Sequence, residues 1–171
     1  MVKRNDEIKL GESLSKYFEA KESQKRRRPS LVFLFTGLII FLIDRGVKNY
    51  FVANPEIAID LGAGFGFRLQ TNEGVAFGLP LPGMLALGLA IVLTIILIHF
   101  IIKSLRQEEV GEAVALGAVT VGAISNLIDR VRFGAVIDYI DVRWFTVFNL
   151  ADAMITLGVL AALIMAFRRQ S

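Results

Sequence analysis

Four long apolar stretches constrain this chain more than any other feature. They cover about residues 31–52, 84–102, 113–129 and 150–167. A helix needs about 20 apolar residues to cross a bilayer, with a range of about 17–25. Across the chain 54% of residues are hydrophobic and only 20% are charged, which leaves too little polar surface for a soluble domain. The sequence therefore predicts an all-α membrane protein with four transmembrane helices.

A charged segment precedes the first apolar stretch. Residues 1–28 hold nine of the 19 Lys and Arg residues, four of them consecutive at 25–28. The segment has no apolar run of the kind found in secretory signal peptides. We expect residues 1–30 to be a cytoplasmic extension and residues 31–171 to be the membrane domain.

The basic residues near the apolar stretches predict the orientation, because Lys and Arg accumulate on the cytoplasmic side. Thirteen of them flank the chain ends and the link between the second and third stretches, whereas four lie on the other side. Both termini are therefore expected in the cytoplasm. This topology also explains the net charge of +3, so no nucleic acid partner is expected.

The segment 53–83 is too long to be a simple link between two helices. Aromatic and apolar residues alternate along 61–70, a period typical of a strand. Residues 72–74 (Asn-Glu-Gly) have turn chemistry, and residues 75–77 are interpreted as a returning strand. We expect a small extracytoplasmic β-hairpin, or β-cradle, between the first and second helices.

Four aspartates are predicted at one depth, the outer third of the membrane. With a rise of about 1.5 Å per residue, Asp44 lies about 20 Å and Asp129 about 24 Å from the cytoplasmic ends of their spans. Asp152 opens the fourth span, and Asp138 falls in the outer link just before it. An ionised group inside the bilayer is costly and is usually paired or functional.

Helical spacing places further polar residues beside these acids. Asn126 and Arg130 share a helical face with Asp129, Asn149 and Thr156 share one with Asp152, and Lys48 shares one with Asp44. Two carboxylates brought close in a partly dry site cannot both ionise easily. Such a pair can take a proton from water while it donates another to a carbonyl oxygen, as in aspartic peptidases.

Structural interpretations of the same residues remain open. Asp44 with Lys48 is favoured as a structural ion pair, the third-span residues could be a polar cluster at a helix end, and Asp152 with Asn149 could be a helix N-cap. Asp138 could be an ordinary loop acid. An ion- or proton-coupled transporter also uses intramembrane carboxylates, although its acids should extend across the bilayer. A membrane scaffold would need no such convergence.

The residue inventory narrows the chemistry. The chain has no cysteine and one histidine, so a thiol nucleophile, a disulfide framework and a His or Cys metal cluster are excluded. We expect neither a metal nor a cofactor. Any catalysis must depend on carboxylates, amides and basic side chains.

Four sequence elements resemble those of bacterial lipoprotein signal peptidase, also called signal peptidase II. They are Asp44-x-x-x-Lys48, the Asn72–Gly78 stretch, the block from Gly122 to Arg130 with its continuation from Gly134 to Asp141, and Phe148-Asn-Leu-Ala-Asp152. Their order and spacing are those of the family, over about residues 31–167.

The resemblance implies an aspartic endopeptidase of the bacterial plasma membrane. Such an enzyme removes signal peptides from diacylglyceryl-modified prolipoproteins by cleavage just before the lipidated cysteine. Carried over by motif, the catalytic pair is Asp138 and Asp152. The supporting or substrate-binding residues are Asn72, Gly74, Asn126, Asp129, Arg130, Asn149 and Ala151. The resemblance further implies a monomer in contact with membrane lipids, with an active site near the outer face, that binds globomycin-type inhibitors.

The chain departs from the family pattern at a few positions near this site. Arg45, Val75, Ser125 and Tyr139 stand where Gln, Ala, Gly and Phe are common. None of the four changes removes a required functional group.

Overall fold

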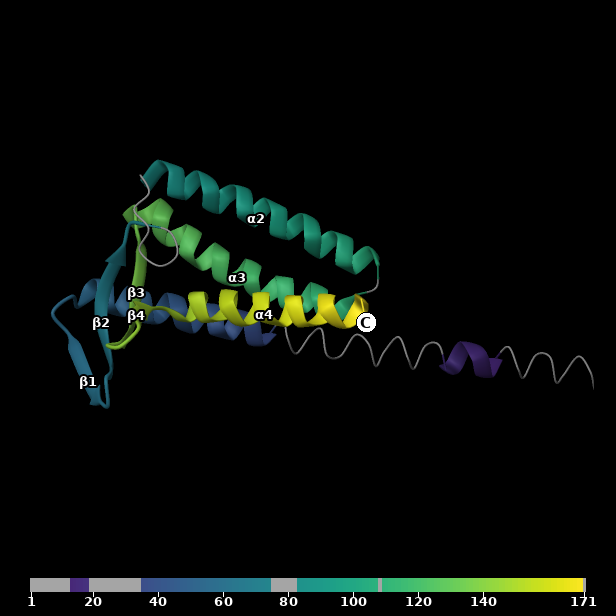
Figure 1. The fold of residues 1–171 in the computed structure, drawn as a ribbon, viewed down its shortest axis with the longest axis horizontal. Coiled ribbons are helices and arrows are strands. Elements are labelled where there is room, and N and C mark those ends of the chain that lie inside the picture. The colour runs from purple at the N-terminus through teal and green to yellow at the C-terminus, as the bar shows by residue number, and fades with distance from the viewer. Residues whose placement is uncertain (1–12, 19–34, 75–82, 108, 171) are drawn as a thin grey trace, which may run out of the picture. The chain divides into compact units, whose positions relative to one another are not determined.

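The computed structural model describes residues 13–18, 35–74, 83–107 and 109–170 (Figure 1). The chain forms two compact units, Met1–Thr36 and Gly37–Ser171. In the first unit, residues 13–18 form a short helix. The candidate site and all labelled elements belong to the second unit.

Long helices make up most of the second unit. A helix covers residues 35–53, here called the first helix. It is followed by α2 (Gly83–Arg106), α3 (Val110–Phe133) and α4 (Leu150–Gln170). Among the described residues, α2, α3 and the part of α4 up to Arg168 are long and apolar enough to cross a membrane. Figure 1 shows α3 between α2 and α4, and α3 packs against both.

The helices extend beyond the apolar stretches from which they were predicted. The third stretch predicted a span over 113–129, whereas α3 runs over 24 residues and includes Glu112 in its first turn and Arg130 and Arg132 in its last. Hydropathy marks only the apolar part of a helix, while charged residues continue its backbone hydrogen bonding at both ends.

A four-stranded antiparallel sheet lies at one end of the helices. Its strands are β1 (Ala58–Gly62), β2 (Phe65–Asn72), β3 (Val136–Val142) and β4 (Thr146–Phe148), in the spatial order β1-β2-β3-β4. The first helix and α3 end beside this sheet and α4 begins there (Figure 1). The sheet therefore joins segments that are far apart in sequence.

The predicted hairpin differs from the one observed. The expected strand over 61–70 is interrupted by a turn at Gly62, Ala63 and Gly64, whose φ angles are 81°, 51° and 80°. Glycine adopts positive φ readily, so the Gly-Ala-Gly sequence turns the chain about ten residues earlier than predicted. The expected return strand at 75–77 lies outside the described residues.

The link between α3 and α4 is a second correction. It was expected to be a short loop, but it forms β3 and β4, and Asp138 of β3 pairs with Gln70 of β2. Val136, Ile137 and Val142 are β-branched and buried, which favours a strand over a loop. The fold is therefore mostly helical, with a sheet whose strands come from the segments before α2 and after α3. It is not all-α with one local hairpin.

Close packing between α3 and α4 positions the site. A Cβ atom on Gly122 would lie 2.5 Å from the carbonyl oxygen of Ala151 and 2.9 Å from the Ile155 side chain. Only glycine fits at this approach. The contact brings the turn of α3 that carries Asn126 against the first turn of α4.

Candidate active site

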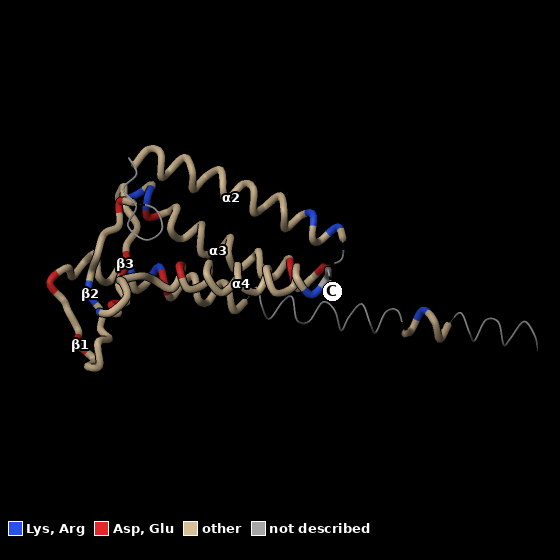
Figure 2. Tube along the Cα trace, in the orientation of Figure 1, with Lys and Arg blue, Asp and Glu red and all other residues tan. Residues whose placement is uncertain are grey.

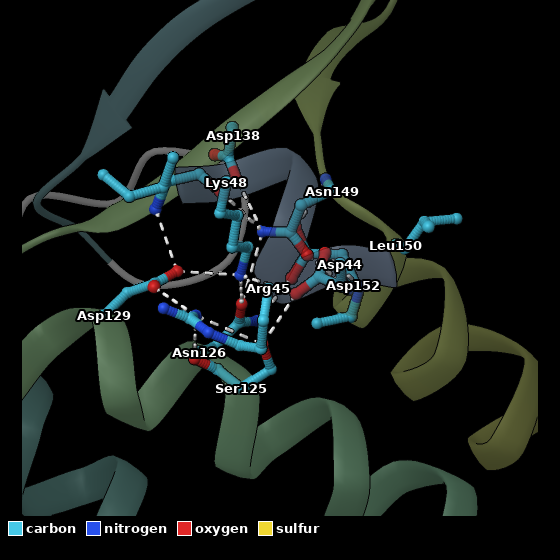
Figure 3. A network of polar contacts seen from close by, with 12 residues as sticks. Asp44, Arg45, Lys48, Ser125, Asn126, Asp129, Asp138, Asn149, Leu150 and Asp152 are labelled. Carbon is cyan, nitrogen blue, oxygen red and sulfur yellow. Dashed lines mark hydrogen bonds and ion pairs between the residues drawn. The ribbon is translucent and has the colours of Figure 1, made fainter. Parts of the chain in front are cut away.

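The predicted polar residues meet under the sheet, where the first helix, α3, β3 and α4 come together (Figure 3). The buried charged or amide side chains at most 1% exposed are Asp44, Lys48, Asp129, Asp138 and Asn149. Their contacts divide into two clusters. The cationic cluster comprises Asp44, Arg45, Lys48 and Asp129, and the amide cluster comprises Asn126, Asp138, Asn149 and Asp152.

Lys48 lies at the centre of the cationic cluster. Its Nζ atom is 3.1 Å from Asp44 Oδ2 and 2.7 Å from Asp129 Oδ2, and it donates to Asn126 Oδ1 at 2.9 Å. An ammonium group has three protons to donate, so all three have acceptors. The expected pair of Asp44 and Lys48 is present, but Lys48 is shared with a second carboxylate.

Arg45 supplies a second cation to the same cluster. Its Nη1 atom lies 2.5 Å from Asp129 Oδ1 and 3.2 Å from the carbonyl oxygen of Ser125. Asp129 thus has a cation on each oxygen, and its Oδ2 atom also accepts the backbone N–H of Ile137 at 3.2 Å. That hydrogen bond fixes β3 at the residue before Asp138.

Asp44 is surrounded by donors from three other segments. Its Oδ2 atom accepts the Ser125 hydroxyl at 2.6 Å, and its Oδ1 atom accepts the Tyr139 hydroxyl at 3.0 Å. The backbone N–H of Ala151 points at Oδ1 from 3.4 Å. Asp44 therefore ties the first helix to α3, to β3 and to the start of α4.

Asparagine side chains connect the two aspartates of the amide cluster. Asn149 Nδ2 donates to Asp138 Oδ1 at 2.7 Å, and the backbone N–H of Asn149 points at Asp152 Oδ2 from 3.3 Å. Asn126 Nδ2 donates to Asp152 Oδ1 at 2.7 Å. Both carboxylates are thus held around the same asparagine, Asn149, as Figure 3 shows.

The N-cap interpretation of Asn149 and Asp152 is also present in the structure. Asn149 Oδ1 accepts the backbone N–H of Asp152 at 2.8 Å, and Asp152 Oδ2 accepts the backbone N–H of Asn149 at 3.3 Å. This is a reciprocal capping box. The cap occupies one oxygen of Asp152 and leaves Oδ1 directed at Asn126, so capping orients the carboxylate without using all of it.

The environment of Asp138 changes its acidity. Burial, and then the neighbouring charge of Asp152, raise the pKa of the Asp138 carboxyl from 3.8 to about 7, although hydrogen bonds from Asn149 and Asn72 lower it in part. Asp138 therefore holds or shares a proton near neutral pH. A carboxyl group of this kind can donate a proton to a substrate oxygen.

The remaining predicted residues, Asn72, Gly74 and Arg130, bond to Asp138 or to one another. Asn72, at the end of β2, contacts Asp138 and accepts the Gly74 N–H at 3.1 Å. Arg130 Nη2 donates to the carbonyl oxygen of Gly74 at 3.0 Å. Among the described residues, Arg130 Nε is buried without a hydrogen-bond partner. Asn72, Gly74 and Arg130 thus connect the sheet to the end of α3.

Sequence reasoning did not identify three residues that the structure adds. Arg45, Ser125 and Tyr139 were noted only as departures from a pattern, yet each bonds to Asp44 or Asp129. One signal was available: Ser125 and Asp129 are separated by four residues and so share a face of α3. The contribution of Tyr139 depends on β3, which was not predicted.

The charges of the two clusters differ. The cationic cluster has two carboxylates and two cations. The amide cluster has two carboxylates and two neutral amides, so one retained proton leaves it with a single negative charge. The described residues contain no group of three or more His, Cys, Asp or Glu side chains arranged to hold a metal ion.

The chain is similar to known proteins along most of its length. The family model described as "Signal peptidase (SPase) II" matches residues 36–168. A lipoprotein signal peptidase of Halothermothrix orenii is 36% identical over 135 residues, covering 76% of this chain and 90% of that protein. One of Bartonella bacilliformis is 39% identical over 150 residues, covering 81% and 89%.

A solved structure described as a bacterial membrane enzyme shares the fold. Its TM-score is 0.71 at 23% sequence identity, and the match covers 82% of this chain and 90% of that one. Nothing in these comparisons supports the transporter alternative. The convergence of acids beneath the sheet, the match along most of the chain and the shared fold agree, and the chain belongs to the signal peptidase II family.

Proposed function

We propose that Asp138 and Asp152 are the catalytic pair of a membrane aspartic endopeptidase that removes signal peptides from prolipoproteins. The observation that carries this proposal is the amide cluster. It contains the buried Asp138 and the half-buried Asp152, which both bond to Asn149, with no cation bonded to either among the described residues. Family membership indicates the reaction class. The raised pKa of Asp138 favours a carboxyl that keeps the proton needed for catalysis.

In this mechanism the pair carries one proton at neutral pH. The ionised carboxylate takes a proton from a water molecule, which attacks the scissile carbonyl carbon. The protonated carboxyl donates to the carbonyl oxygen. When the tetrahedral intermediate collapses, the proton taken from water passes to the leaving nitrogen, and a hydroxyl proton of the intermediate returns to the carboxylate that had donated to the carbonyl oxygen. Asn126 and Asn149 hold the two carboxyl groups during these transfers.

We propose that the first helix also crosses the membrane, which adds one span to the three formed by α2, α3 and α4. It carries Asp44, Arg45 and Lys48, so composition alone does not place it with the three apolar helices. These charged groups bond to one another or to α3, β3 and α4, so they are not presented to lipid. Its exposed side chains include Leu38, Ile39, Leu42 and Ile43. This apolar face suits lipid.

The site is proposed to open at the outer surface of the plasma membrane, with both termini in the cytoplasm. Basic residues lie at the ends of α2 and α4 away from the sheet (Figure 2), including Lys103, Arg106 and Arg168. By the positive-inside rule those ends face the cytoplasm, which leaves the sheet outside. A bond beside a lipid-anchored cysteine would meet the site at that depth.

The substrate is proposed to be a prolipoprotein whose cysteine already carries diacylglycerol, cleaved just before that cysteine. We further propose that the chain acts as a monomer among membrane lipids, and that globomycin-type inhibitors bind at the amide cluster. Residues 1–30 are proposed as an extension separate from the peptidase domain of residues 31–171.

A cleavage assay on purified protein tests the proposal. A diacylglyceryl prolipoprotein should shift on a gel with wild type and not with Asp138→Asn. Asp141→Asn is the matched control, because Asp141 also lies on β3 but bonds to the partly exposed Arg68. Cleavage by Asp138→Asn at the wild-type rate, or loss of cleavage by Asp141→Asn alone, would contradict the assignment.

A further inference from the structure

The Tyr139 hydroxyl joins three segments that carry the site. Tyr139 follows Asp138 in β3, so its side chain points to the opposite side of the strand. The side chain is 2% exposed. Its hydroxyl donates to Asp44 Oδ1 at 3.0 Å and accepts the backbone N–H of Leu150 at 3.3 Å. Leu150 begins α4, two residues before Asp152.

The direction of these hydrogen bonds is fixed by the state of the phenol. Burial, and then the negative charge of Asp44, raise the pKa of Tyr139 above its ordinary value. The hydroxyl therefore keeps its proton and has one to donate, while its oxygen remains an acceptor. The Phe51 ring stacks on the Tyr139 ring, with centroids 6.1 Å apart and planes 7° apart. Phe51 thus holds the ring in place from the first helix.

We propose that the Tyr139 hydroxyl is a positioning group that sets how the strand bearing Asp138 lies against the helix turn bearing Asp152. This rests on the function proposed above for the two aspartates. Tyr139 does not touch the reacting atoms. It acts by joining the segment before one aspartate to the segment after the other, with Asp44 as the fixed point.

Ser125 shows that this role differs from simply satisfying Asp44. The Ser125 hydroxyl donates to the other oxygen of the same carboxylate at 2.6 Å. It comes from α3 and bonds to neither β3 nor α4 among the described contacts. Loss of either hydroxyl weakens the hold on Asp44, but only loss of the Tyr139 hydroxyl also removes the bond to Leu150 at the start of α4.

The test compares the kinetics of three variants on a diacylglyceryl prolipoprotein. Tyr139→Phe should lower kcat about tenfold and leave KM within about twofold, because misplacement of catalytic groups affects the chemical step. Ser125→Ala should lower the melting temperature about as much as Tyr139→Phe does. It should lower kcat clearly less than Tyr139→Phe. Tyr50→Phe, on an exposed tyrosine of the first helix, should match wild type in both.

A fourth variant tests the bond from the other side. Leu150→Pro removes the N–H that Tyr139 accepts and leaves the bond from Tyr139 to Asp44 in place. Proline is well tolerated at the first position of a helix, and a capping residue typically has the extended backbone that suits the residue before a proline. This variant should show the same fall in kcat, and the double variant with Tyr139→Phe should fall no further. It keeps the test decisive if Tyr139→Phe does not fold.

The outcomes separate this inference from the proposed function. If wild type cleaves but Tyr139→Phe and Leu150→Pro keep the wild-type kcat, the positioning role is wrong. It is equally wrong if the loss lies in KM, or if Ser125→Ala loses as much kcat as Tyr139→Phe. If wild type fails to cleave the lipidated substrate, the proposed function fails instead.

Discussion

The two clusters beneath the sheet hold equal numbers of carboxylates in different ways. In the cationic cluster, Asp129 has a cation on each oxygen and Asp44 shares Lys48 with it. In the amide cluster, Asp138 and Asp152 are held by the side chains of Asn126 and Asn149. The clusters touch where Lys48 donates to Asn126.

This difference teaches how one buried site can serve both structure and chemistry. A carboxylate beside a cation favours its ionised form, so it is a poor proton donor. A carboxylate held by neutral amides stays oriented, while burial and its like-charged neighbour favour retention of a proton. The cationic cluster therefore suits a structural role, and the amide cluster suits general acid and base catalysis.

Asparagine substitutions give the largest contrast between the clusters. Asp138→Asn and Asp152→Asn should each lower turnover by about a thousandfold or more, since neither can then exchange a proton, while the protein still folds. Gel-shift cleavage assays and thermal unfolding in detergent measure the two effects. Residual turnover within about tenfold of wild type would remove that residue from the pair.

Loss of the central cation should instead affect stability. Lys48→Met leaves Asp44 and Asp129 buried with one cation fewer, and breaking such a buried ion network costs about 3–5 kcal/mol. Arg45→Gln should cost less, because Asp129 keeps Lys48 and Gln can still donate a hydrogen bond. The melting temperatures of the two variants in detergent check the order. A larger loss for Arg45→Gln would show that the cluster centres on Arg45.

Asp44→Ala provides an intermediate case. The sequence alone suggests that Lys48 would lose its partner, but the structure leaves Lys48 beside Asp129. We expect folded protein to fall more than the activity of each folded molecule, because Tyr139, Ser125 and Ala151 all lose an acceptor. Normal accumulation and melting with lost activity would place Asp44 in the catalytic machinery.

The helices and most of the site could be predicted because their signals are local. Apolar length gave α2, α3 and α4, and helical spacing gave Asp129 with Asn126. The partners of these residues across the fold could not be predicted in the same way. Arg45 reaches Asp129 because the first helix lies against α3, and Tyr139 reaches Asp44 because β3 crosses the helix ends. Contacts between segments so far apart in sequence leave little trace in a local pattern.

The amide cluster should also give the protein a pH-dependent stability that the cationic cluster does not explain. Folded Asp138 keeps its proton up to about pH 7, whereas the unfolded carboxyl releases it near 3.8. Between these values the folded state binds more protons, so this group's stabilising contribution falls as pH rises, by at most about 1.4 kcal/mol per pH unit. Asp138→Asn lacks this term, so its stability relative to wild type should rise between about pH 4 and 7 and then level off. Thermal unfolding of both proteins across that range measures the difference, and a constant difference would contradict the raised pKa.

Removal of residues 1–24 should have the smallest effect on either cluster. Every residue of both clusters lies at position 44 or later. The deletion keeps the four basic residues at 25–28, which are close enough to the first span to orient it, because the charge bias acts within about 15–20 residues of a span. Protease accessibility of tagged termini, together with the cleavage assay, should therefore match the full chain.

A deletion of residues 1–28 is the matched comparison, because it also removes the four basic residues and should weaken or invert insertion. Lost cleavage by a correctly oriented protein lacking only residues 1–24 would give the charged segment a role in catalysis that neither cluster explains.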